Sequence, residues 1–169
     1  ILKVAQMCEG DFIWTFSDDD YVAENGLNDV IKFLKKNNRE DLGLVVLRVK
    51  SFIVEKETGK KEVFTTNFDE NKPEIFKIDR KDIVGLGFQN IAFLSILIYN
   101  NKFLKKLLAE DMALLKQGIG TSHVHMVLFS LMFLKYPHLN GYVFNKVVVY
   151  QDMPEYRYFV EDKFTLHYA

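Results

Sequence analysis

The sequence predicts an α/β fold in which a mixed sheet is flanked by helices. Three observations support this prediction. A β-branched and aromatic run at residues 12–16 is followed by three acids and then by a helical pattern. Two more strand-like runs, at residues 44–55 and 61–66, enclose a turn with a glycine. An almost entirely apolar helical stretch after residue 123 leads into a last strand-like run at residues 142–150.

The composition fits one ordinary globular domain over residues 1–169. Of the 169 residues, 49% are hydrophobic and 27% are charged, which is enough apolar material to bury a core. The 22 Lys and Arg nearly balance the 23 Asp and Glu, so we expect no nucleic-acid partner bound through counterion release. The longest apolar runs, residues 91–99 and 126–134, are about half the length that a membrane-spanning helix needs, and we expect no transmembrane segment.

A single cysteine, Cys8, excludes an internal disulfide and a cysteine-based zinc site. A reducing compartment follows, so we expect a cytoplasmic protein and leave open a position at the inner face of the membrane. The chain begins with Ile1 and shows no charged-then-apolar leader, which indicates a piece of something longer. The oligomeric state cannot be predicted.

The first part of the chain reads as helix, strand and helix. Residues 1–8 have a weak helical spacing that stops at Gly10, and residues 12–16 have the profile of a short interior strand with acids at its carboxyl end. Lys35 and Lys36 suit the negative end of a following amphipathic helix. The apolar face of that helix is predicted to consist of Leu27, Val30, Ile31 and Leu34.

The second part begins with a predicted hairpin. Residues 44–55 and 61–66 read as strands joined around Gly59, which can supply the positive φ of a turn. Residues 67–73 read as a surface excursion, after which Asp79 can cap a short helix. Residues 91–99 fit a buried strand or a buried helix equally well, and residues 103–115 read as a helix. The tail from residue 151 is predicted to be irregular or peripheral.

The strongest chemical feature is the run Ser17-Asp18-Asp19-Asp20. Three adjacent carboxylates repel one another, and such a cluster next to an apolar strand is costly without a compensating cation. In open α/β sheets, ligands bind outside the carboxyl ends of strands, where this cluster is predicted to fall. The simpler explanation is that the acids flank the following helix, where negative charge is favourable, although one Asp would be enough for that purpose.

Residues 10–20, Gly-Asp-Phe-Ile-Trp-Thr-Phe-Ser-Asp-Asp-Asp, together with the following helix, resemble the central segment of family-2 glycosyltransferases of the GT-A fold. The resemblance extends to the order of the later elements, including the Gly85–Phe88 segment and the apolar run with Ser95. It implies a GT-A-like mixed sheet of which this chain is the acceptor-side portion. The nucleotide-binding βαβ part that begins the family's domain has no counterpart before Ile1.

The resemblance implies transfer of a sugar, with inversion, from a nucleotide-sugar donor to a glycan or lipid-linked acceptor of a surface polysaccharide. It also implies Mn²⁺ or Mg²⁺ held against the donor diphosphate, where the ion would neutralise the charge of the leaving group. On this basis Asp20 is the expected metal ligand, Asp18 the expected donor contact, and Asp19 can serve either purpose. The family also writes its motif with an acid where this chain has Ser17.

The general base that the family places at the start of a later helix is not visible here. That neighbourhood carries His123 and His125, which the positive end of the helix dipole would keep neutral and able to accept a proton. We therefore expect His125 or His123 to be catalytic. The alternative is that both are ordinary capping or interior histidines. Glu110-Asp111 ranks below them as a candidate base.

Two other functions stay open. Asp18-Asp19-Asp20-Tyr21-Val22 also satisfies the nucleophile motif of haloacid-dehalogenase phosphatases, although the later acidic pair that completes their magnesium site does not occur. The chain could also be a non-catalytic remnant or binding module with the same fold. Missing nucleotide-binding strands favour this reading, and three costly acids argue against it.

Overall fold

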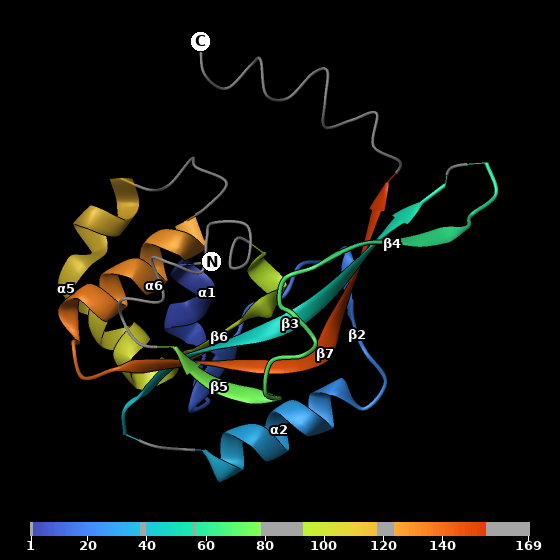
Figure 1. Ribbon diagram of the computed structural model, residues 1–169. Helices are drawn as coiled ribbons and strands as arrows, with labels where there is room; N and C mark the ends of the chain where they lie inside the picture. Colours follow the sequence, from blue (N-terminus) through green and yellow to red (C-terminus); the bar gives the residue numbers. More distant parts are fainter. Residues whose placement is uncertain (1, 38–39, 56, 79–92, 118–123, 155–169) are drawn as a thin grey trace.

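The computed structural model describes residues 2–37, 40–55, 57–78, 93–117 and 124–154 (Figure 1). The strands are β1 (Phe12–Trp14), β2 (Asp20–Val22), β3 (Leu42–Val54), β4 (Lys61–Thr66), β5 (Ile75–Ile78), β6 (Leu97–Asn100) and β7 (Asn140–Pro154). They form one seven-stranded sheet with the main order β1-β6-β3-β7-β2, in which β4 also pairs with β3 and β5 with β7. The helices are α1 (Leu2–Met7), α2 (Gly26–Lys36), the 3-10 turn η1 (Leu94–Ile96), α5 (Asn101–Gln117) and α6 (Val124–Lys135).

The sheet is mixed, as predicted, and β3 is its centre. This strand pairs parallel with β7 and antiparallel with β6. Residues 42–49 of β3 are all buried, because the strand has neighbours on both sides and its Val- and Leu-rich sequence suits both faces. The pairing of β3 with β4 confirms the predicted hairpin, and Gly59 in its turn has a φ of 69°.

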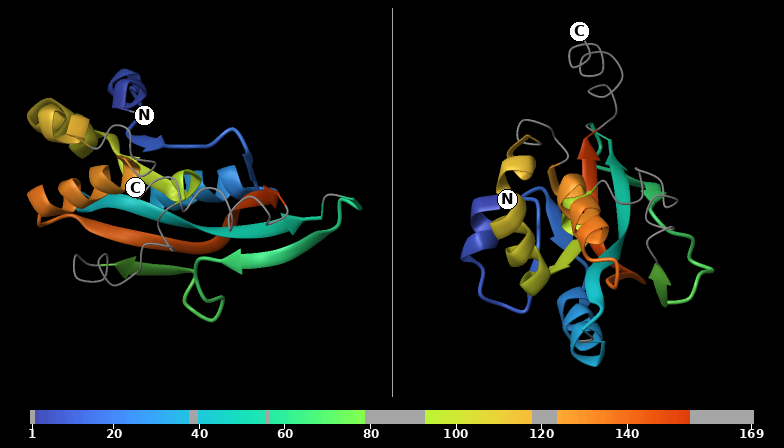
Figure 2. Two further views of the ribbon diagram at one scale, coloured as in Figure 1. Left: turned by 90° about the horizontal axis from the view of Figure 1, so that it is seen from above. Right: turned by 90° about the vertical axis from the view of Figure 1, so that its left-hand side faces the viewer.

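Three helices lie together on one face of the sheet. Figures 1 and 2 show α1, α5 and α6 as this group, and α2 apart from it, packed against β7. The predicted apolar character of α6 agrees with its position, since His125, Leu128, Phe129, Met132 and Phe133 are buried. No described helix is long and apolar enough to cross a membrane.

The predicted buried face of α2 is partly wrong. Val30 is buried, but Leu27 is 53% exposed and Ile31 is 40% exposed. Phe33 is buried instead and stacks on Phe144 with ring centroids 5.2 Å apart. The helix is rotated relative to the prediction because this aromatic pair, which spacing on α2 alone does not reveal, sets its contact with the sheet.

Several other boundaries differ from the predictions. The ambiguous run before residue 100 divides into η1 and β6, so both a helical turn and a strand are present. The predicted surface excursion contains the buried residues Asn67 and Phe68, and the following β5 was not predicted. Asn67 is buried because its side chain accepts a hydrogen bond from the Val49 N–H and donates one to the Leu47 carbonyl. The predicted Asp79 cap and the Gly85–Phe88 segment lie outside the described residues.

The two strands beside the acidic run lie at opposite ends of the main strand path. β1 pairs with β6 alone among the described strands, so it is an edge strand in this part of the chain and not the interior strand predicted. The chain then passes to the far edge, where β2 pairs antiparallel with β7 (Figure 2). Asp20 therefore begins a strand of its own, whereas Asp18 and Asp19 lie in the turn before it.

Candidate functional site

The segment before the acids is fixed to η1 and the start of β6 by hydrogen bonds. The Trp14 indole Nε1–H donates to the Ser95 carbonyl at 2.8 Å, and the Thr15 hydroxyl donates to the Leu94 carbonyl at 2.8 Å. The Ser17 backbone N–H donates to the Ser95 Oγ at 2.8 Å. Ser95 is fully buried, so the turn that carries Asp18 and Asp19 starts from a firmly held position.

The three carboxylates have different surroundings. Asp18 and Asp19 are exposed, and Asp19 Oδ1 accepts a hydrogen bond from the Ser17 hydroxyl. Asp20 is half-buried, and its Oδ1 is buried with no hydrogen-bond partner in the described part of the chain. Asp20 is thus the acid whose carboxylate has an unused, water-shielded acceptor.

Burial raises the pKa of Asp20 above its ordinary value, and the nearby charge of Asp19 acts in the same direction. Hydrogen bonds from the side chains of Ser95 and Gln151 oppose the rise but do not cancel it. The ionised form of Asp20 is therefore disfavoured, and a cation beside it would reverse that preference.

The acidic run has no ion-pair partner among the described Lys, Arg and His side chains. None of the ion pairs among the described residues includes Asp18, Asp19 or Asp20. Within the same ranges, no three His, Cys, Asp or Glu side chains come together as a metal site. The structure brings Asp19 and Asp20 within electrostatic reach of each other, so two carboxylates are what the described chain offers a cation.

Of the two predicted histidines, the structure describes His125 alone. His123 lies outside the described residues. His125 is 4% exposed on the buried side of α6, and its backbone carbonyl accepts a hydrogen bond from the buried Tyr99 hydroxyl at 3.1 Å. A role as base stays a prediction.

Glu110 and Asp111, the lower-ranked candidate base, take part in contacts between α5 and α6. The Lys135 ammonium lies 3.0 Å from Glu110 Oε2 and also pairs with Asp111. Hydrogen bonding to Lys135 lowers the pKa of the exposed Glu110, which keeps it ionised. These contacts favour a structural role for the pair.

The sequence did not predict most of the polar residues that lie around Asp20. Gln151 was assigned to an irregular tail, but it lies in β7 directly opposite Asp20. Ser51 lies on β3 opposite Gln151 and is fully buried. The available signal was a polar residue within an apolar strand pattern, since Ser51 interrupts β3 and Ser95 interrupts the run before β6.

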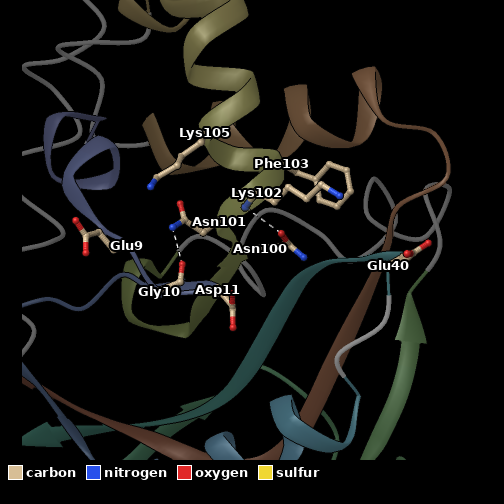
Figure 3. Close-up of a pocket in the computed structure, with 9 residues that line it drawn as sticks. All are labelled: Glu9, Gly10, Asp11, Glu40, Asn100, Asn101, Lys102, Phe103 and Lys105. Atoms are coloured by element: carbon tan, nitrogen blue, oxygen red, sulfur yellow. Dashed lines mark hydrogen bonds between the residues drawn. The ribbon is translucent and has the colours of Figure 1, made fainter.

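A separate polar cavity of about 470 Å³ lies at the opposite end of β1 from the acidic turn. Figure 3 shows its lining, in which Asn101 donates a hydrogen bond to the Gly10 carbonyl at 2.5 Å. The cavity is lined by Glu9, Gly10, Asp11, Glu40, Asn100, Asn101, Lys102, Phe103 and Lys105. Among the predicted site residues that the structure describes, Asp18, Asp19, Asp20 and His125 do not contribute to it.

Comparison with known proteins gave no assignment. No family model matches the chain, and no curated protein matches its sequence.

Proposed function

We propose that this chain is the acceptor-side part of a metal-dependent, inverting glycosyltransferase. It would transfer a sugar from a nucleotide-sugar donor to a glycan or lipid-linked acceptor. The observation that supports this most is the state of Asp20, which has a buried and unpartnered Oδ1. Its pKa is raised by burial and by the adjacent Asp19 carboxylate. A divalent cation would satisfy the free oxygen and remove the repulsion together.

The residues present fit Mg²⁺ or Mn²⁺. These ions prefer oxygen ligands, and Mg²⁺ is usually held by one or two carboxylates plus the phosphates of a substrate. Asp20 and Asp19 can supply the carboxylate part of such a set, and a donor diphosphate would supply the rest. The proposal therefore links metal binding to nucleotide binding at the same place.

Each candidate residue then has a role in the proposed sugar transfer. Asp20 would hold the ion, Asp19 the ion or the donor, and the exposed Asp18 the donor's ribose or sugar. His125 or His123 would take the proton from the acceptor hydroxyl as it attacks the anomeric carbon. When bound, the metal ion would neutralise the charge that develops on the nucleoside diphosphate leaving group.

The experiment is thermal unfolding with Mn²⁺ and a panel of nucleoside diphosphates, alone and together. A ligand that binds only the folded state raises the melting temperature. We expect one nucleoside diphosphate to raise it further when Mn²⁺ is present than when it is absent. No response to any ligand, together with turnover of a generic phosphate ester, would favour the phosphatase. No response and no turnover would favour a non-catalytic module.

A further inference from the structure

The sequence contains two Asn-Gly pairs, Asn25-Gly26 and Asn140-Gly141. In such a pair the backbone nitrogen of the glycine can attack the asparagine Cγ, because glycine has no Cβ to obstruct the approach. A bond forms between this nitrogen and Cγ, the Cγ–Nδ2 bond breaks, and ammonia leaves with the proton of the glycine N–H. Water then opens the cyclic imide at either carbonyl, which gives aspartate or isoaspartate. Water is the only co-reactant, so the fold decides which pair reacts.

The fold holds the Asn140-Gly141 pair inside the sheet. The Asn140 backbone N–H donates to the Asp41 carbonyl at 2.7 Å, and its side-chain amide donates to the Asp41 carboxylate. Gly141 is buried between β3 and β5, where it is paired with Leu44 and Ile78. Ring closure at Asn140 would have to separate β7 from its neighbouring strands.

The Asn25-Gly26 pair lies instead in the turn between β2 and α2. Asn25 is exposed, and its φ of 62° and ψ of −1° are a left-handed conformation that asparagine tolerates. Its side chain makes no capping hydrogen bond to α2. The Gly26 N–H donates to the Ala23 carbonyl at 2.8 Å, and the Asp29 N–H donates to the Asn25 carbonyl at 3.0 Å. Ring closure turns the peptide between Asn25 and Gly26, so it requires the opening of these two bonds in the first turn of α2.

We propose that Asn25 is a site of spontaneous deamidation in the folded protein, and that Asn140 is protected from it. Helix ends open at a lower free energy than paired strands in a core, so the turn before α2 reaches the reactive conformation more often than the start of β7. This inference is independent of the proposed sugar transfer.

The product would disturb the junction between β2, α2 and β7. Isoaspartate adds one carbon to the backbone just before Gly26. Space around Gly26 is limited, because a Cβ atom there would lie 3.0 Å from Val22 Cγ1 and 3.2 Å from the Val148 carbonyl oxygen. The modification therefore falls where α2 is packed most closely against the sheet.

The test is incubation of the wild-type protein at neutral pH, both folded and in denaturing urea. Peptide mass spectrometry and methyl labelling by an isoaspartate methyltransferase then locate the product. The two pairs should react at similar rates in urea, which makes Asn140 a matched control in the same chain. In the folded protein, isoaspartate should form at least about tenfold faster at Asn25 than at Asn140. Equal rates in the folded protein, or no product at Asn25, would overturn the proposal.

A second measurement identifies the opening that leads to reaction. Opening of one helical turn exposes little surface, so urea below the unfolding transition should leave the rate at Asn25 nearly unchanged. Rates that rise steeply with urea, in parallel at Asn25 and Asn140, would show that only the unfolded chain reacts and would overturn the proposal.

The variant Asn25→Gly is a further control. Glycine adopts a φ of 62° without steric cost, so the turn is kept while the reactive amide is removed. The folded variant should lose most of the methyl labelling seen in wild type. Unchanged labelling would place the reaction at another residue and overturn the assignment to Asn25.

Discussion

Asp20 is the residue at which the chain accepts an unfavourable electrostatic arrangement. Its carboxylate is half-buried, lies near Asp19, and keeps one oxygen without a partner. Asp18 and Asp19 are exposed, so solvent screens their charges. The cost of the acidic run is therefore concentrated at the first residue of β2.

This arrangement predicts a pH-dependent stability without metal. Because the folded-state pKa of Asp20 is raised above the ordinary 3.8, the folded state binds the proton more tightly than the unfolded chain. Asp20 thus lowers the free energy of unfolding as pH rises above 3.8 and through the raised value. The free energy of unfolding that Asp20→Asn gains over wild type should therefore be larger at pH 7 than at pH 4. Urea unfolding at both pH values, without metal, checks this, and a difference that does not change with pH would contradict it.

Ser95 and Tyr99 allow metal support to be distinguished from ordinary packing. Ser95→Ala removes a donor to Asp20 and leaves the Ser17 N–H without its acceptor, so it should cost about 1–3 kcal/mol and weaken Mn²⁺ binding. Tyr99→Phe should cost about 1 kcal/mol with no effect on Mn²⁺, because the Tyr99 hydroxyl donates to the His125 carbonyl on α6 and not to the acidic run. Urea unfolding and Mn²⁺ titration of both variants check this. Equal effects on Mn²⁺ would show that Ser95 has no special role.

His125 is the residue on which the proposed base can be tested. If it takes the acceptor proton, His125→Ala should lower kcat by about 10²–10⁴-fold with little change in donor affinity. Met132→Ala is the control, since Met132 is also buried on α6 and its loss should destabilise the helix without this effect on kcat. An unaltered rate in His125→Ala would assign this histidine to packing.

At the scale of elements, α2 shows how a partner strand overrides a helical pattern. Its apolar residues fit several faces, and the Phe33–Phe144 stack decides which of them turns towards the sheet. Phe33→Ala should therefore cost about 3–5 kcal/mol, whereas Leu27→Ala, at an exposed position, should cost less than about 1 kcal/mol. Urea unfolding of the two variants is the measurement. A larger cost at Leu27 would restore the face predicted from the sequence.

The connection from β1 to β2 carries the candidate site. Trp14, Thr15 and Ser17 each hydrogen-bond to residues 94–97, so η1 and the start of β6 serve as the support for the acidic turn. Asp20 then joins β7 through the β2 pairing. The site is therefore assembled from three segments that are distant in sequence.

At the scale of the molecule, local sequence patterns predicted which helices and strands form better than they predicted which of them pack or pair with one another. The hairpin around Gly59, the helix after residue 100 and the apolar α6 follow from turn chemistry and periodicity, which are local. The edge position of β1, the face of α2 and the extension of β7 through Gln151 depend on which strands pair. The chain's own sequence does not specify that pairing in any short window.

The same division holds for the candidate site. The acids were predictable because like charges in sequence are close in space whatever the fold. Ser51, Ser95 and Gln151 were not, because each is an ordinary polar residue until the fold places it: the sheet register sets Gln151 opposite Asp20 and Ser51 opposite Gln151, and Ser95 lies in η1. His123 and the Gly85–Phe88 segment lie outside the described residues, so those predictions stay as they were.

The central claim is that Asp20 holds a divalent cation, and Mn²⁺ titration of wild type and Asp20→Asn by calorimetry tests it most directly. The account predicts that the wild-type protein binds one Mn²⁺, more tightly with a nucleoside diphosphate present, and that Asp20→Asn binds it at least tenfold more weakly while remaining folded. Equal Mn²⁺ affinity in the two proteins, or no binding by the wild type even with nucleoside diphosphates, would contradict it.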